Sequence, residues 1–96
     1  LLFMNLNGGM IYQMKQTKKG LKHRLDLVAQ HEPKAADFFR EIKEKFRRNE
    51  VEESVIVDTL ALAWGARDSA AKNRLRTLPE EGEVDSRGLP QVIHYV

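Results

Sequence analysis

Apolar residues recur at helical spacing between residues 33 and 46. The apolar positions are Ala35, Phe38, Phe39, Ile42 and Phe46. Positions three and four apart share one face of an α-helix, so this stretch predicts an amphipathic helix with a core-facing stripe. Pro33 suits its first turn, where a backbone N–H would have no partner. The stripe is wide for a small monomer, and we expect part of it to serve a dimer.

A shorter helix is expected before it. Leu21, Leu25 and Val28 recur at spacings of four and three, which predicts a helix over residues 21–30. The proline that follows separates this N-terminal helix from the next one.

The chain ahead of that helix is first apolar and then basic. Two alternatives are open for residues 1–14, LLFMNLNGGMIYQM. Residues 10–14 form a short strand, because β-prone side chains stand there, or the segment is foreign to the natural protein, since its three methionines offer several starts. Residues 15–20, KQTKKG, together with the charges at 22–24, are either a solvated linker and helix face or an arm or helix that contacts phosphates.

The most apolar stretch covers residues 55–64 and is followed by glycine. It predicts a buried helix with Leu60 and Trp64 facing inward, while the small Ala61 lets a second helix cross closely. Gly65 has no side chain to clash in the left-handed conformation that ends many helices, so the tetrapeptide GARD predicts a tight corner.

A second helix is predicted after the corner. Asp68 or Ser69 can cap it by accepting a hydrogen bond from a free backbone N–H. Pro79 ends it at about Leu78, because the residue before a proline avoids helical geometry. Its inward positions are Ala71, Leu75 and Leu78, and its outward face is formed by Arg67, Ser69, Lys72, Asn73 and Arg76.

This order of parts resembles the winged helix-turn-helix superfamily of bacterial, archaeal and phage transcriptional regulators. The residues that carry the likeness are Leu60, Ala61, Trp64, Gly65, Ala71, Leu75, Leu78, Glu81, Gly82 and Val84. The resemblance implies a mainly α fold with a small β-hairpin wing, in which a three-helix core follows an N-terminal helix. Residues 83–85 would be the first wing strand, 86–88 the tip and 91–96 the returning strand.

The expected organisation therefore has three parts. Residues 1–14 are an N-terminal extension, residues 15–32 a basic segment with the N-terminal helix, and residues 33–96 the winged helix-turn-helix domain. A length of 96 residues suits one small domain whose core is marginal unless it dimerises.

The resemblance implies sequence-specific binding of double-stranded DNA by a homodimeric transcriptional regulator, with the second helix in the major groove. Lys72, Asn73 and Arg76 are the candidates for base edges, because asparagine pairs with adenine and cations with guanine. The candidates for phosphate contacts are Arg67, Ser69 and Arg74, and Arg87 at the wing tip would reach the backbone or the minor groove.

Charge is distributed unevenly along the chain. The net charge is +2 overall, but residues 1–48 carry eleven Lys or Arg against five acids, hence +6, and residues 49–96 five against nine, hence −4. Because phosphate neutralisation supplies most affinity for nucleic acid, an alternative function is a protein-interaction module, such as a viral or plasmid inhibitor or an assembly subunit. A continuous positive band joining Lys72, Arg76, Arg87 and the N-terminal lysines favours DNA. Acids that interrupt this band favour a protein partner.

Other classes of function find no support in the sequence. Cysteine is absent, the three histidines stand far apart, and no phosphate loop or paired-carboxylate motif occurs, so we expect no enzyme, metal, cofactor or small-molecule ligand. No apolar run approaches the roughly 18 residues of a membrane span, and no secretory signal is recognisable. We expect a cytoplasmic protein without a membrane partner, at the nucleoid if it binds DNA.

Overall fold

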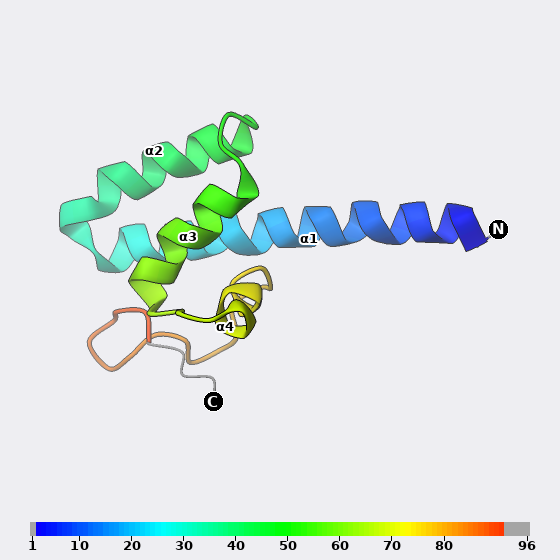
Figure 1. Ribbon diagram of the computed structural model, residues 1–96. Helices are drawn as coiled ribbons and strands as arrows, with labels where there is room; N and C mark the ends of the chain where they lie inside the picture. The colour runs from blue at the N-terminus through cyan, green and yellow to red at the C-terminus, as the bar shows by residue number, and fades with distance from the viewer. Residues whose placement is uncertain (1, 92–96) are drawn as a thin grey trace.

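The computed structural model describes the backbone of residues 2–91 and the side chains of residues 15–91. Within that range the chain is built from helices (Figure 1). The elements in order are α1 (Leu2–His31), the 3₁₀ turn η1 (Pro33–Ala35), α2 (Ala36–Arg47), α3 (Glu53–Trp64) and α4 (Ser69–Arg74).

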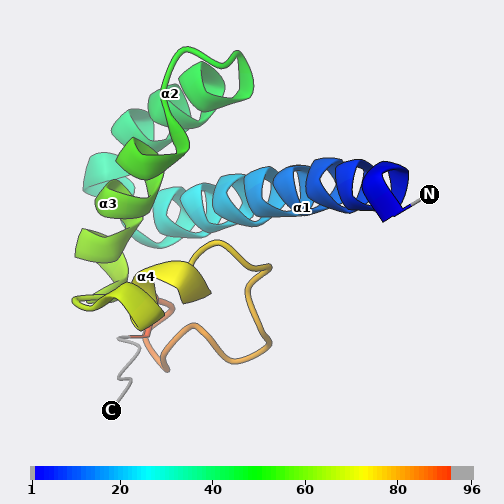
Figure 2. The same ribbon diagram turned by 45° about the vertical axis from the view of Figure 1, so that its right-hand side comes forward.

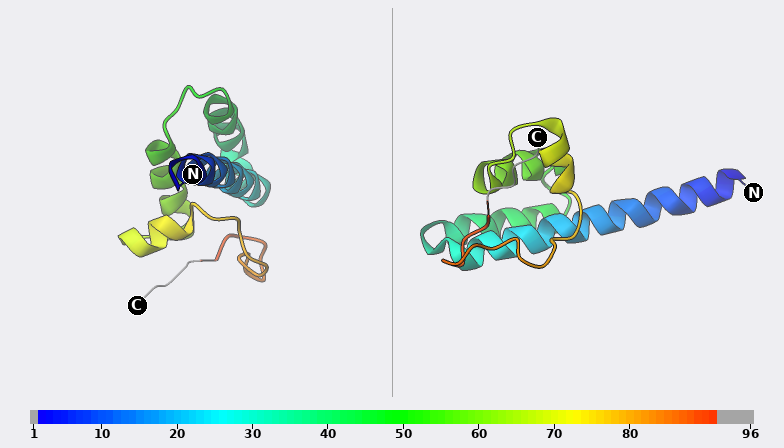
Figure 3. Two further views of the ribbon diagram at one scale, coloured as in Figure 1. Left: turned by 90° about the vertical axis from the view of Figure 1, so that its right-hand side faces the viewer. Right: turned by 90° about the horizontal axis from the view of Figure 1, so that it is seen from below.

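Helix α1 is the axis of the molecule. Its C-terminal half is surrounded by α2, α3, α4 and the tail that follows them, as the end-on view in Figure 3 shows. Its N-terminal half projects beyond the other elements in Figures 1 and 2. A helix of 30 residues is about 45 Å long at 1.5 Å per residue, and this explains the long dimension of a molecule that measures 49 × 33 × 21 Å.

The core forms where the predicted apolar faces meet. Its largest fully buried apolar side chains are Leu21, Leu25 and Val28 of α1, Ile56, Val57, Leu60 and Trp64 of α3, and Leu75 after α4. Phe39 and Phe46 of α2 are also buried, whereas Phe38 is 54% exposed. The expected helices over residues 33–46 and 55–64 are confirmed, and the apolar stripe of α2 faces the core only in part.

Arg24 is buried in the middle of this core, although its sequence position suggested a solvent-facing charge. Its side chain is fully inaccessible and forms an ion pair with Glu83, which is 11% exposed. Its Nε donates to the carbonyl oxygen of Leu75 at 3.1 Å, and its Nη2 to that of Arg74 at 3.3 Å. The guanidinium lies 5.5 Å from the centre of the Trp64 ring. One cation thus joins α1, α3, the end of α4 and the tail.

The prediction of a β-hairpin wing is wrong, and with it the winged helix-turn-helix fold. The described part of the tail contains no strand, only an isolated antiparallel bridge between Val84 and Pro90. The physical reason is that Pro90 has no N–H to extend a ladder, while Glu83 turns its side chain to Arg24. Most of the expected returning strand, residues 92–96, lies outside the described residues.

The expectations for the N-terminal third also need correction. Helix α1 begins at Leu2 and not at residue 21, so residues 10–14 are helical and not a strand, and residues 15–20 are helix and not a linker. No proline interrupts the chain before Pro33. Gly20 also has a packing role, because a Cβ there would lie 2.7 Å from the carbonyl oxygen of Thr77.

The second helix of the corner is shorter than predicted. The α-helix ends at Arg74, and the next turn is tightened by bonds of the i to i+3 type, such as Thr77 N–H to Arg74 O at 3.2 Å. Tight last turns are common at helix ends. Leu78 is consequently 42% exposed, whereas the pattern predicted that it faces inward.

Replacing Arg24 should remove much of the stability. In Arg24→Met, an apolar chain fills the space but leaves the Glu83 carboxylate and two carbonyl groups without their donor. Breaking one side of a buried ion pair typically lowers the free energy of unfolding by about 3–5 kcal/mol, and we expect that loss in urea unfolding followed by circular dichroism.

The matched control removes both charges. Because Arg24→Met combined with Glu83→Leu leaves no buried ion, we expect it to regain most of the lost stability. If Arg24→Met lowered the free energy of unfolding by less than about 1 kcal/mol, which is typical of solvent-exposed ion pairs, this result would contradict a buried role for Arg24.

Candidate functional site

The corner between α3 and α4 has the geometry that its sequence indicates. Gly65 ends α3 in the left-handed conformation, with φ 68° and ψ 24°, and its N–H bonds to Ala61 O. Ala66 is buried behind it. Asp68 caps α4 by accepting a hydrogen bond from Ala71 N–H at 2.8 Å. The predicted corner is confirmed, and of the two proposed caps Asp68 is the one that acts.

Five of the predicted DNA-binding residues lie at this corner and along the outer face of α4. They are Arg67, Ser69, Lys72, Asn73 and Arg76, of which Arg67, Ser69 and Asn73 are exposed and the other two half-buried. Lys72 lies 3.5 Å from Asp58 of α3, and Arg76 lies 2.7 Å from Glu53. Arg76 also donates to Asn73 Oδ1 at 2.6 Å. The side chains predicted to read bases therefore bond to each other and to acids of α3.

The remaining two predicted residues are held by the tail. Arg74 forms ion pairs with Glu80 and Glu83, and only 23% of its side chain is exposed. Arg87 bonds to Asp85 at 3.0 Å. The seven predicted residues therefore do not form a single surface of hydrogen-bond donors that is open to DNA.

Electrostatics at the corner are therefore mixed. Each cation among Lys72, Arg74, Arg76 and Arg87 has a carboxylate within 4 Å. Exposed pairs of this kind contribute little stability and exchange readily. The acids nevertheless place negative charge where phosphates would approach, which weakens the phosphate neutralisation that supports DNA binding.

Asp85 organises the tail beside this surface. Its Oδ1 accepts hydrogen bonds from the N–H groups of Arg87 at 2.9 Å and Leu89 at 3.0 Å. The hydrogen bond from Leu89, with smaller help from Arg87, holds the pKa of this carboxyl below its ordinary value of 3.8. The ionised carboxylate therefore stabilises the turn over residues 85–89.

A surface that the sequence analysis did not single out as a site lies on α2 and α3. We call it the α2/α3 groove. It encloses about 270 Å³ between Phe38, Glu41, Ile42, Lys45, Val51 and Val55. Phe38 is 54% and Val55 46% exposed. Leu62 lies two turns along the same face of α3 as Val55 and is 88% exposed. The excess width of the apolar stripe was the signal in the sequence that pointed to this groove.

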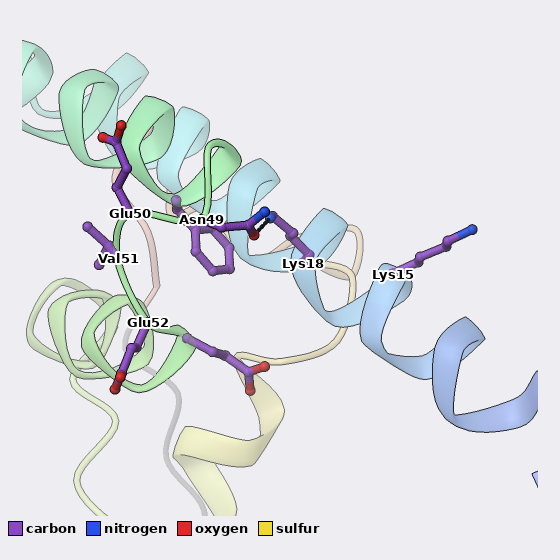
Figure 4. Close-up of a pocket in the computed structure, with 8 residues that line it drawn as sticks. Lys15, Lys18, Asn49, Glu50, Val51 and Glu52 are labelled. Atoms are coloured by element: carbon purple, nitrogen blue, oxygen red, sulfur yellow. Dashed lines mark hydrogen bonds between the residues drawn. The ribbon is translucent and has the colours of Figure 1, made fainter. Parts of the chain in front are cut away.

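A larger hollow opens between α1 and the loop that joins α2 to α3 (Figure 4). It encloses about 770 Å³, and its lining includes Lys15, Lys18, Asn49 and Phe46. Lys18 donates to Asn49 Oδ1 at 2.5 Å and lies 5.2 Å from the centre of the Phe46 ring. In Figure 4 Lys15 extends away from Asn49, and the glutamates of the loop point in different directions. Ligand sites hold convergent polar groups, and this hollow has none.

The described residues offer neither a metal site nor a membrane span. Across that part of the chain, no three acidic or histidine side chains come together as a cation would require. No helix there combines the length and the hydropathy needed to cross a bilayer.

No protein-family model, curated protein or solved structure matches this chain. The surfaces of the molecule therefore carry the indications of its function, because fold alone does not fix function.

The pKa of Asp85 makes the turn over residues 85–89 sensitive to acid. Because the pKa of Asp85 in the folded state lies below 3.8, the ionised carboxylate stabilises the turn fully above that pH. This stabilisation is lost as the pH falls through the pKa of the folded state. We expect the side-chain carboxyl carbon of Asp85 and the amide of Leu89 to titrate together below pH 3.8 in NMR spectra. The Leu89 amide should lose this transition in Asp85→Asn. A midpoint at or above 3.8 would contradict the hydrogen-bonded turn.

Proposed function

We propose that this chain is a protein-interaction module that works as a homodimer, with the α2/α3 groove as its dimer interface. The observation that carries the proposal is the exposure of Phe38 of α2 and Val55 of α3, which line the same groove. Scattered apolar residues are normal on a protein surface, but a grouped patch that borders a groove is typical of an interaction site.

Burial of the groove would supply the driving force. Burying a fully exposed apolar side chain of this size contributes about 1.5–3 kcal/mol to the free energy of association. Phe38 and Val55 would each contribute less, because only about half of each side chain is exposed. The side chains of Ile42 and Val51 add apolar surface at the bottom of the groove. A domain of 96 residues has a small core of its own, so added burial is a substantial part of its stability.

The rim of the groove favours a second copy as the occupant. Glu41 and Lys45 lie on the rim and form an ion pair of 3.5 Å within one chain. A patch that carries both an acid and a base next to its apolar centre is self-complementary about a two-fold axis, as an isologous interface requires. Two antiparallel α2 helices would bring Glu41 of one copy towards Lys45 of the other and cover Phe38 and Ile42 of both.

The acids of the corner also support a protein partner over DNA. Acids that interrupt the positive band favour a protein-interaction module over DNA binding. Asp58 beside Lys72, Glu53 beside Arg76 and Asp85 beside Arg87 are such acids.

Substitution of the groove should separate the two copies. We expect the native chain to sediment as a dimer, and Phe38→Asp or Val55→Asp to sediment as a monomer with an unchanged helical circular dichroism spectrum. The matched control is Leu78→Asp, because Leu78 is 42% exposed but lies outside the groove, and this variant should stay dimeric.

The rim supplies a second arm of the experiment. Glu41→Lys should weaken the dimer by placing like charges together, and Glu41→Lys combined with Lys45→Glu should restore it. A native chain that remains monomeric at millimolar concentration, or a dimer that survives Phe38→Asp, would contradict the proposed interface.

Double-stranded DNA binding is a second candidate, because a glycine corner joins α3 to α4, as in the connection of a helix-turn-helix. The glycine corner joins two packed helices, and Arg67, Ser69 and Asn73 are exposed beside it. In this alternative, phosphates replace the acids now paired with Lys72 and Arg76, because exposed ion pairs exchange readily.

Binding to random-sequence duplexes over a salt series tests this candidate. If α4 reads bases, selection enriches a palindromic site, affinity falls steeply with salt, and Arg76→Ala costs about 1–3 kcal/mol of specific binding. The control Arg48→Ala removes a cation at the far end of α2 and should change specificity little. No retention of duplex DNA at low salt would exclude this candidate.

A further inference from the structure

The outer side of α1 carries a basic stripe. Lys15, Lys19 and Lys22 follow one another at spacings of four and three, so they lie on one side of the helix. Lys15 and Lys19 are exposed and Lys22 is half-buried, and the exposed His23 lies beside them. We call these four residues the basic stripe.

No acid neutralises this stripe from its own helix. The first acidic residue of the chain is Asp26, and its carboxylate bonds to Lys43 of α2 at 2.8 Å. The two other cations of this region point elsewhere, because Lys18 bonds to Asn49 and Arg24 is buried against Glu83. Glu50, Glu52 and Glu53 line the same hollow as Lys15, so Lys19, Lys22 and His23 form the part of the stripe that is most available to an external anion.

The helix that carries the stripe continues into an uncharged end. Residues 1–14 contain no Asp, Glu, Lys, Arg or His, and nine of the fourteen are apolar or aromatic. From Leu2 onwards this end is helical, and it projects beyond the rest of the molecule (Figures 1 and 2). A helical segment as short as this uncharged end, with two adjacent glycines, is only marginally stable in water. Contact with an apolar surface would therefore stabilise its helical conformation.

We propose that α1 docks on an anionic lipid bilayer, with the basic stripe on the headgroup phosphates and the uncharged end in the boundary between headgroups and acyl chains. Interfacial helices combine apolar residues with Lys on the polar side, and a basic segment next to an apolar one supplies two binding signals that reinforce each other. This surface lies on α1, so the proposal is independent of the dimer interface on α2 and α3.

The order of charges along α1 selects lipid among the possible occupants. A nucleic acid would satisfy Lys15, Lys19 and Lys22 but would leave the uncharged end in water. A second copy of α1 would cover the uncharged end but would bring like charges of the two stripes together unless the helices were fully offset. A bilayer presents an anionic layer and an apolar layer in adjacent depths, which matches the two parts of this helix.

Co-sedimentation of the full chain with vesicles tests the proposal. We expect binding to vesicles of phosphatidylcholine mixed with phosphatidylserine, much weaker binding to phosphatidylcholine alone, and a rise in helical circular dichroism on binding. The combined variant Lys15→Gln, Lys19→Gln and Lys22→Gln should bind about a hundredfold more weakly, because each basic residue near the surface contributes a factor of about five.

The matched control removes the same charge elsewhere. Lys34→Gln, Arg40→Gln and Arg48→Gln alter exposed cations outside the stripe, and this variant should keep most of the vesicle binding. Phe3→Ser with Leu6→Ser should weaken binding while keeping its salt dependence. Phe38→Asp alters the proposed dimer interface but not α1, so this variant should still bind vesicles. Failure of the dimer proposal is therefore distinguishable from failure of the lipid proposal.

Three results would overturn the proposal. They are equal binding of the stripe variant and its control, equal binding to vesicles with and without phosphatidylserine, and absence of vesicle binding. Retention of duplex DNA that depends on the stripe lysines but not on Phe3 and Leu6, without vesicle binding, would reassign the stripe to nucleic acid.

Discussion

The fold depends on the burial of one cation. Arg24 lies in the middle of α1 with no accessible surface, and burying a charge is costly unless it is paired and fully hydrogen-bonded. Glu83 supplies the countercharge, and the carbonyl groups at the end of α4 accept the remaining hydrogen bonds. These contacts add to the apolar packing of Ala71 and Leu75, which belong to the same buried core as Leu21 and Leu25, and together they hold α4 and the tail against α1. The tail thus adopts the path that brings Glu83 to Arg24 and does not form a wing.

The two proposed interaction surfaces lie on different elements because the core uses only part of each helix. In α2 the core takes Phe39 and Phe46, which leaves Phe38 at the edge of a groove. In α1 the core takes the side with Leu21 and Leu25, and Lys15 and Lys19 remain exposed. The face of α4, for which base reading was expected, is instead paired with acids of α3. Both proposed interaction surfaces therefore lie away from the face of α4.

Local signals in the sequence predicted local structure. The spacing of apolar residues predicted the helices over 33–46 and 55–64, and Gly65 predicted the corner, because each feature depends on a few neighbouring residues. The wing was predicted because the order of elements resembled a known superfamily. This prediction failed because Glu83 pairs with Arg24, which is far away in the sequence. For the same reason, the lysines that pair with acids across helices were not recognisable in advance. The exposure of Phe38 depends on how α2 packs, which periodicity alone leaves open.

The ion pair of Arg24 and Glu83 joins positions that are 59 residues apart. During synthesis α1 precedes the tail, and a domain folds as a unit once its parts are available. Until residue 83 has been made, however, Arg24 has no countercharge, and packing α2 and α3 around it would bury an unpaired ion. Burial of Arg24 is therefore favourable only once the tail can pair with it. The core around Arg24 thus depends on a residue far along the chain, and we expect a polypeptide cut before Glu83 to lose this part of its packing.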